Sequence, residues 1–109
     1  LYVGQGGAPE GVLAAAALKC IGGQMQGRLV FRNEEEKARA TRVGITDLDR
    51  LYDLNELASG ETVFCATGVT HGGLLSGVDM NNGFVETETL VMTSFDGMVR
   101  RVRSKRIVA

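Results

Sequence analysis

GQGGAPEGVLAAAALKCIGG, residues 4–23, predicts a glycine-rich turn followed by a helix that is apolar on nearly every side. Pro9 fits the first turn of this helix, where its missing N–H group is not needed, and Gly22-Gly23 suits a left-handed C-cap. Beyond the first turn only Lys19 is charged, and such a helix is normally buried against several neighbours. The 109-residue chain has too little material to cover it on every face, so we expect a partner or additional polypeptide to do so.

The rest of the chain alternates strands and helices and ends in a meander. Asn33 is placed to cap a charged helix whose acids come first and whose bases come last, as the helix dipole favours. Asp96-Gly97 is a strong hairpin signal, and Asn81-Asn82-Gly83 indicates another turn. This order predicts a single layered α/β domain, residues 1–109, with a mixed sheet that ends in an antiparallel hairpin. The expected elements are a strand ending at residues 1–3, a helix over 8–21, a strand over 25–31, a helix over 34–42, short elements over 50–53 and 55–58, a strand in mid-sheet over 62–67, and strands over 84–94 and 98–108.

Composition limits the class of protein. Apolar residues make up 44% and charged residues 23%, and the net charge of −1 excludes the strongly basic surface of a dedicated nucleic-acid binder. No apolar run approaches the ~18 to 20 residues needed to cross a bilayer, and Leu1-Tyr2-Val3-Gly4 does not resemble a signal peptide. We therefore expect a soluble, cytoplasmic protein with no membrane partner. Cys20 and Cys65 lie in apolar stretches without metal-ligand spacing, so we expect two buried free thiols.

The last predicted strand carries a strip of cations with no acid among them: Arg100, Arg101, Arg103, Lys105 and Arg106. Such a strip is typical of an exposed strand edge that charge protects from further pairing. It would also suit the phosphates of RNA or DNA, but no aromatic residue interleaves the cations for base stacking. We expect an exposed edge strand and no nucleic-acid partner.

The glycine turn before the first helix is the candidate site. Free N–H groups at a helix N-terminus, with no side chains in the way, suit an anion such as phosphate. The Gly4-Gln5-Gly6-Gly7 pattern is a weak signal, since it has neither the Rossmann nor the P-loop spacing. A carboxylate at Glu10 would repel a nearby phosphate, and a divalent metal bridging the two would remove that conflict. Alternatively Glu10 only complements the helix dipole, and its spacing alone favours this second interpretation.

Four segments together form a recognisable pattern. They are Gly-Gly-Ala-Pro-Glu-Gly-Val-Leu-Ala-Ala-Ala-Ala-Leu-Lys-Cys over residues 6–20, Met-Gln-Gly-Arg-Leu over 25–29, Ala-Thr-Gly-Val-Thr over 66–70 and Thr-Glu-Thr-Leu-Val-Met over 87–92. These segments resemble the class II fructose-1,6-bisphosphatases. The resemblance spans nearly all of the chain and corresponds to the distal third of those longer enzymes. It implies the layered α/β fold of the lithium-sensitive sugar and inositol phosphatases.

The resemblance also implies roles for two residues. Glu10 corresponds to the family's last metal-ligand glutamate, and Gly7 to a glycine that contacts the substrate. The implied cofactor is Mn²⁺ or Mg²⁺, and the implied reaction is hydrolysis of the 1-phosphate of fructose 1,6-bisphosphate in gluconeogenesis, by an intact enzyme expected to be a homo-oligomer. The family's other metal carboxylates and its catalytic groups lie upstream. We therefore expect the chain to be a fragment with no catalytic residue of its own and no activity alone.

One segment departs from the family pattern, and one other class of function stays open. Thr70-His71-Gly72-Gly73 stands where the family often has Thr-Asp-Gly-Asp, and we expect His71 to be a surface residue rather than a ligand. The alternative to an enzyme fragment is a non-catalytic α/β domain that self-associates and buries its alanine-rich helix against a second copy.

Overall fold

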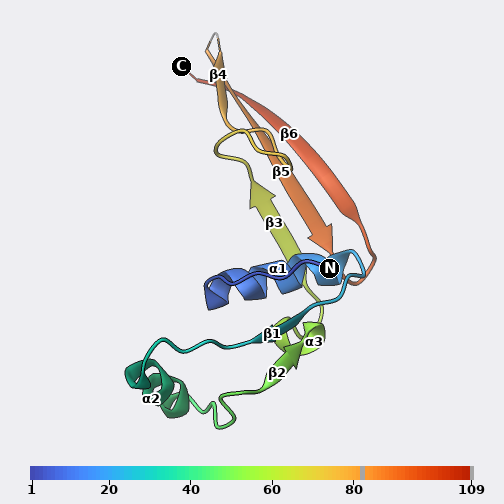
Figure 1. Cartoon of the computed structure of the whole chain (residues 1–109). Helices are drawn as coiled ribbons and strands as arrows, with labels where there is room; N and C mark the ends of the chain where they lie inside the picture. Colours follow the sequence, from blue (N-terminus) through green and yellow to red (C-terminus); the bar gives the residue numbers. More distant parts are fainter. Residues whose placement is uncertain (82, 109) are drawn as a thin grey trace.

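The computed structural model describes residues 1–81 and 83–108 (Figure 1). It is an α/β chain with a two-stranded and a four-stranded sheet. The elements are α1 (Ala8–Cys20), β1 (Gln26–Arg28), α2 (Glu34–Arg42), β2 (Leu51–Asp53), α3 (Leu54–Leu57), β3 (Val63–Thr67), β4 (Asp79–Asn81), β5 (Phe84–Thr93) and β6 (Val99–Ile107). No helix in the described ranges is long and apolar enough to cross a membrane.

Helix α1 begins where the sequence predicts and ends one residue earlier, at Cys20, with Ile21 as its C-cap. Gly7 is its N-cap, and Pro9 lies in the first turn. At the other end Gly22 adopts φ +74°, and the Gly23 N–H donates to the Leu18 carbonyl at 2.8 Å. This arrangement satisfies a carbonyl of the last turn and needs glycine in the left-handed region.

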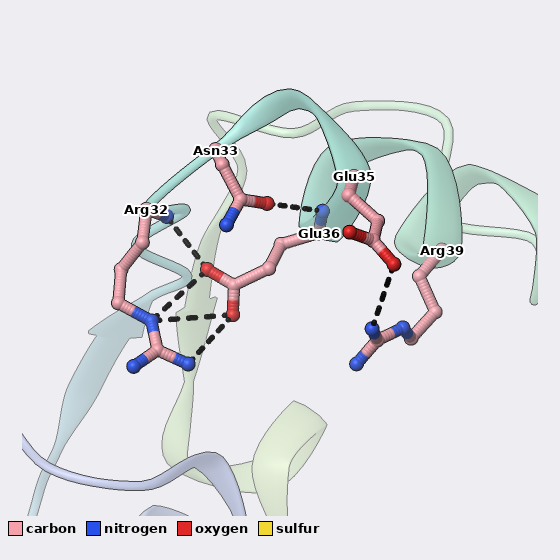
Figure 2. A network of polar contacts seen from close by, with 5 residues as sticks. All are labelled: Arg32, Asn33, Glu35, Glu36 and Arg39. Carbon is pink, nitrogen blue, oxygen red and sulfur yellow. Dashed lines mark hydrogen bonds and ion pairs between the residues drawn. The ribbon is translucent and has the colours of Figure 1, made fainter.

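Helix α2 lies apart from the four-stranded sheet, at the end of two long connections (Figure 1). The Asn33 side chain accepts a hydrogen bond from the Glu36 N–H at 2.9 Å, which confirms the predicted cap. Figure 2 shows Arg32 reaching the same glutamate with its backbone N–H and its guanidinium, and Glu35 facing Arg39 at 3.8 Å. None of the helix is buried. Ion pairs on such an exposed helix contribute little to stability.

Strand β5 is the centre of the four-stranded sheet. Its C-terminal half pairs with β3 and its N-terminal end pairs with β4, so these two strands share one edge of β5. Strand β6 pairs along the other edge, from Phe84↔Ile107 to Met92↔Val99. The hairpin at Asp96-Gly97 is confirmed, with φ +67° at Gly97. The second predicted turn includes residue 82, which lies outside the described residues.

The expectation of a mixed sheet is wrong, because every described strand pair is antiparallel. A parallel pair needs a crossover connection that returns to the same sheet. Here the helical connection that contains α2 joins β1 to β2, which form a separate antiparallel pair. The strand predicted over residues 25–31 is limited to Gln26–Arg28 because its partner β2 is only three residues long.

The core lies between α1 and one face of the four-stranded sheet. Side chains alternate between the two faces of a strand, so Phe64, Leu90 and Met92 share one face. Cys20 from α1 packs against this face, together with Leu75 from the connection between β3 and β4. The core is small for a chain of this length, and Val12 and Leu13 of α1 stay 44% and 58% exposed. The predicted shortage of material around this helix is therefore confirmed within the described chain.

Strand β3 does not lie in mid-sheet as predicted. It pairs with β5 on one side, and its other edge has no neighbour among the described strands. Its even-numbered residues face the core and its odd-numbered residues are exposed, so Cys65 is an exposed thiol rather than a buried one. Cys20 is buried as expected. Leu1, Tyr2 and Val3 are exposed and in no strand, because no described strand lies beside them to pair.

The shape of the chain reflects this partial core. Its radius of gyration is 18.0 Å, with extents of 55 × 33 × 26 Å. A compact domain of this length has a radius of gyration near ~13 Å. The difference arises from the long β5–β6 ribbon and the outlying α2, both seen in Figure 1. Much of the apolar surface that an α/β layer normally covers is therefore exposed.

Candidate metal-ligand site at the start of α1

Gly7 and Glu10 meet at the N-terminus of α1. Gly7 has φ −65° and ψ 147° and offers no side chain as a cap, while its carbonyl accepts the Gly11 N–H at 3.1 Å. Glu10, three residues further on, folds its carboxylate back over Gly7. A Cβ atom at Gly7 would overlap a carboxylate oxygen of Glu10. The absence of a side chain at Gly7 therefore creates the space that the Glu10 carboxylate occupies.

Both residues are exposed, and Glu10 has no ion-pair partner in residues 1–81 and 83–108. A carboxylate oxygen is the donor that Mg²⁺ and Mn²⁺ prefer, so Glu10 fits as one ligand of such an ion. The described part of the chain brings no three Asp, Glu, His or Cys side chains together in a way that could hold a metal. The described residues therefore do not complete a metal site around Glu10.

A second polar cluster, which the sequence pattern did not single out, surrounds Glu88. Its side chain is only 12% exposed and lies 3.2 Å from Arg103 and 3.5 Å from Arg101. The Ser76 N–H donates to the same carboxylate at 3.1 Å. These interactions, led by the hydrogen bond from Ser76, hold the pKa of Glu88 below its usual value. The alternation of residues along β5 could have placed Glu88 on the core face. The sequence contains no signal that residues 68–78 fold over this side chain.

The segment 68–78 is tied down by backbone hydrogen bonds as well. The Val78 N–H donates to the Val69 carbonyl at 3.0 Å, and Arg101 donates to the Leu74 carbonyl at 2.9 Å. His71 is exposed, as expected, with Nδ1 accepting the Gly77 N–H at 3.1 Å and Nε2 lying 3.5 Å from Asp79. His71 belongs to no group of three or more potential metal-binding side chains in the described ranges.

The basic strip lies on β6, whose residues are all exposed. Arg101, Arg103 and Lys105 face Glu88 and Glu86 of β5, which pairs them across the sheet. The predicted edge strand is thus confirmed, and three of the five cations of the strip pair with acids of β5.

The described residues form an α/β fold with an exposed carboxylate at a glycine-rich helix start, and the class of protein follows from comparison with known proteins. The family described as bacterial fructose-1,6-bisphosphatase, glpX-encoded, matches residues 1–106. The chain belongs to this class II fructose-1,6-bisphosphatase family of phosphatases.

Relatives support the same assignment. A D-fructose 1,6-bisphosphatase class 2/sedoheptulose 1,7-bisphosphatase of Synechococcus elongatus is 46% identical over 105 residues, which cover 84% of this chain and 30% of the relative. A protein of the same description from Prochlorococcus marinus (strain AS9601) is 40% identical over 112 residues, covering 90% of this chain and 34% of the relative. The chain thus spans about a third of the length of the curated relatives that it matches.

Proposed function

We propose that the chain is the part of a class II fructose-1,6-bisphosphatase that contributes a metal-ligand glutamate and a substrate-contacting glycine. The complete enzyme hydrolyses the 1-phosphate of fructose 1,6-bisphosphate to fructose 6-phosphate and phosphate in the cytoplasm. The printed names of the relatives also include sedoheptulose 1,7-bisphosphatase, so the seven-carbon bisphosphate is a second substrate to test. The observation that carries this proposal is the Glu10 carboxylate folded over Gly7 at the open end of α1.

In this proposal Glu10, Gly7 and the first turn of α1 have different roles. Glu10 would hold one Mn²⁺ or Mg²⁺ ion, and free N–H groups in the first turn of a helix such as α1 suit an anion such as phosphate. A divalent cation in such a site polarises the phosphoryl group and lowers the pKa of bound water. Gly7 is the proposed substrate contact, and a side chain at this position would collide with the Glu10 carboxylate.

The described chain alone does not meet the needs of this reaction. Metal-assisted phosphoryl hydrolysis requires several ligands to position charge against the transition state. Glu10 is one ligand, and no further group of candidate ligands exists in the described ranges. We therefore expect the 109-residue chain to show no phosphatase activity by itself.

The test is the Glu10→Gln variant of the complete enzyme, assayed by phosphate release from fructose 1,6-bisphosphate and by calorimetric titration with Mn²⁺. Loss of a direct ligand should weaken Mn²⁺ binding by more than the ~10 to 100-fold typical of groups that only support ligands. Glu34→Gln on α2 makes the same chemical change on an exposed helix away from the site and should leave both quantities unchanged. Normal Mn²⁺ affinity and turnover in Glu10→Gln would refute the proposal.

A further inference from the structure

The segment 68–78 closes on itself at a narrow neck. The backbone of Thr70 and His71 lies directly against Gly77, which belongs to the returning arm of the segment. A Cβ atom at Gly77 would lie 2.5 Å from the Thr70 carbonyl carbon and 2.6 Å from the His71 nitrogen. Glycine at this position therefore lets the two arms touch.

The His71 side chain joins the two arms through a ring nitrogen that carries no proton. Nδ1 accepts the Gly77 N–H at 3.1 Å, while Nε2 lies 3.5 Å from a carboxylate oxygen of Asp79 on β4. A ring nitrogen accepts a hydrogen bond only when it is unprotonated, so the hydrogen of the neutral ring is on Nε2. The contacts of the two nitrogens thus define one tautomer.

Protonation of the imidazole sets these two contacts against each other. Both nitrogens of the imidazolium are donors, so Nδ1–H would face the Gly77 N–H and the hydrogen bond between them would be lost. The Asp79 carboxylate favours the charged ring, and its contact with Nε2 is kept. The side chains of His71 and Asp79 are 66% and 48% exposed, so water reaches the ring and exchanges the proton freely.

The charged groups around the segment differ from His71 in where they titrate. Histidine ordinarily changes charge between about pH 5 and 8, whereas carboxylates, lysine and arginine ordinarily do so outside this range. The hydrogen bond from the Ser76 N–H leads the interactions that hold the pKa of Glu88 below its usual value, so this second attachment of the segment keeps its charge. The charged groups on the neighbouring strands are Asp79, Glu86, Glu88, Arg101, Arg103 and Lys105.

We propose that His71 is a pH-sensitive latch on the segment 68–78, closed when the imidazole is neutral and released at the neck when it is protonated. In the released state the ring stays beside Asp79 and the bond to Gly77 is broken. A Cβ atom at Gly73 would meet open space, so this part of the segment has room to move. Leu75 remains in the core. The latch does not depend on Glu10 or on the proposed function.

The first test reads the tautomer directly. His71 is the only histidine of the sequence, so the ¹⁵N-labelled 109-residue chain gives one pair of imidazole nitrogen signals in a magnetic resonance spectrum. At about pH 8 the proton should be on Nε2, with Nδ1 bare. A proton on Nδ1 at this pH overturns the proposal.

The second test compares two adjacent amides of the same segment. Gly77 N–H donates to His71, and Ser76 N–H donates to Glu88, so Ser76 is an internal control. Protection against hydrogen exchange is measured for both amides and corrected for the intrinsic exchange rate at each pH. From about pH 8 to about pH 5 the protection of Gly77 relative to Ser76 should fall by about threefold to tenfold, as expected for the loss of one neutral hydrogen bond. A ratio that does not change with pH overturns the proposal.

Two exposed-site variants show which group causes the fall. His71→Asn keeps an acceptor oxygen near the position of Nδ1 but does not titrate, so Gly77 should stay protected at both pH values. Asp79→Asn removes the charge beside Nε2 and leaves the bond to Gly77 in place, so the fall should persist. The same fall in His71→Asn as in the wild type, or its disappearance in Asp79→Asn, overturns the proposal.

Discussion

Leu75 links the segment 68–78 to the core, and truncating it tests whether that segment is seated as the structure shows. Leu75 is 7% exposed and packs with Cys20, Leu90 and Met92. Its neighbour Leu74 is 56% exposed. The two residues are adjacent in the chain and chemically identical, so Leu75→Ala and Leu74→Ala form a matched pair that differs only in burial.

The expected magnitude follows from the atoms removed. Changing leucine to alanine deletes three carbon atoms, which are worth about 0.8 kcal/mol each when buried, or about 2 kcal/mol of lost transfer free energy. A residual cavity adds to this loss, within the ~2 to 5 kcal/mol observed for such truncations. The core here is shallow and can collapse around the gap, so we expect the lower part of the range, about 2 to 3 kcal/mol. Leu74→Ala should change the free energy of unfolding by less than about 0.5 kcal/mol.

Urea unfolding followed by far-ultraviolet circular dichroism measures both values. In a separate thermal unfolding experiment, a loss of about 2 to 3 kcal/mol in Leu75→Ala corresponds to a fall in Tm of roughly 8 to 20 °C for a domain of this size. The slope of the transition should be the same in both variants, because the surface exposed on unfolding changes little. Equal destabilisation by Leu74→Ala and Leu75→Ala would show that residues 68–78 do not dock on the sheet through Leu75, and the described core would be wrong.

Three further predictions concern backbone fit, pH and capping. Gly77→Ala places a Cβ 2.5 Å from a backbone carbon across the segment and should destabilise the protein by about 1 to 3 kcal/mol in urea unfolding, whereas Gly73→Ala meets open space and should be nearly neutral. The pKa of Glu88 is lower in the folded protein than its ordinary value of 4.5, so the ionised carboxylate stabilises the fold above pH 4.5, and this stabilisation is lost as the pH falls below that value. Glu88→Gln should therefore flatten the dependence of the free energy of unfolding on pH in this range. An unchanged pH dependence would contradict the prediction. Asn33→Ala removes the cap of α2 and should reduce the stability of that helix by about 1 kcal/mol, seen as faster amide exchange in α2 alone. Unchanged exchange in α2 would contradict the cap.

Local signals in the sequence predicted the elements whose causes are local. The glycines at positions 22 and 97 supply left-handed backbone where a helix ends and a hairpin turns, and both lie where predicted. Asn33 caps its helix because its side-chain oxygen reaches an N–H three residues on. The family likewise follows from the motif around Gly7 and Glu10, and its match extends over residues 1–106.

Predictions that depended on which segment packs beside a strand or helix were less successful. The apolar run of β3 suggested a mid-sheet strand, yet β3 is an edge strand with Cys65 exposed. A one-dimensional pattern records that a strand is apolar, but it does not record whether the polypeptide that covers it belongs to the same chain. The Glu88 cluster was missed for a related reason, because Ser76, Arg101 and Arg103 converge on it from three separate segments.

The amino-acid sequence by itself determined the helix starts and ends, the hairpin, the free thiols and the kinship of the chain, because each depends on residues close together or on a motif read in order. Only the tertiary structure decided which face of the sheet holds the core and which stays open, and how Glu10 lies against Gly7. These features depend on distances between segments remote in sequence, which chain order does not specify.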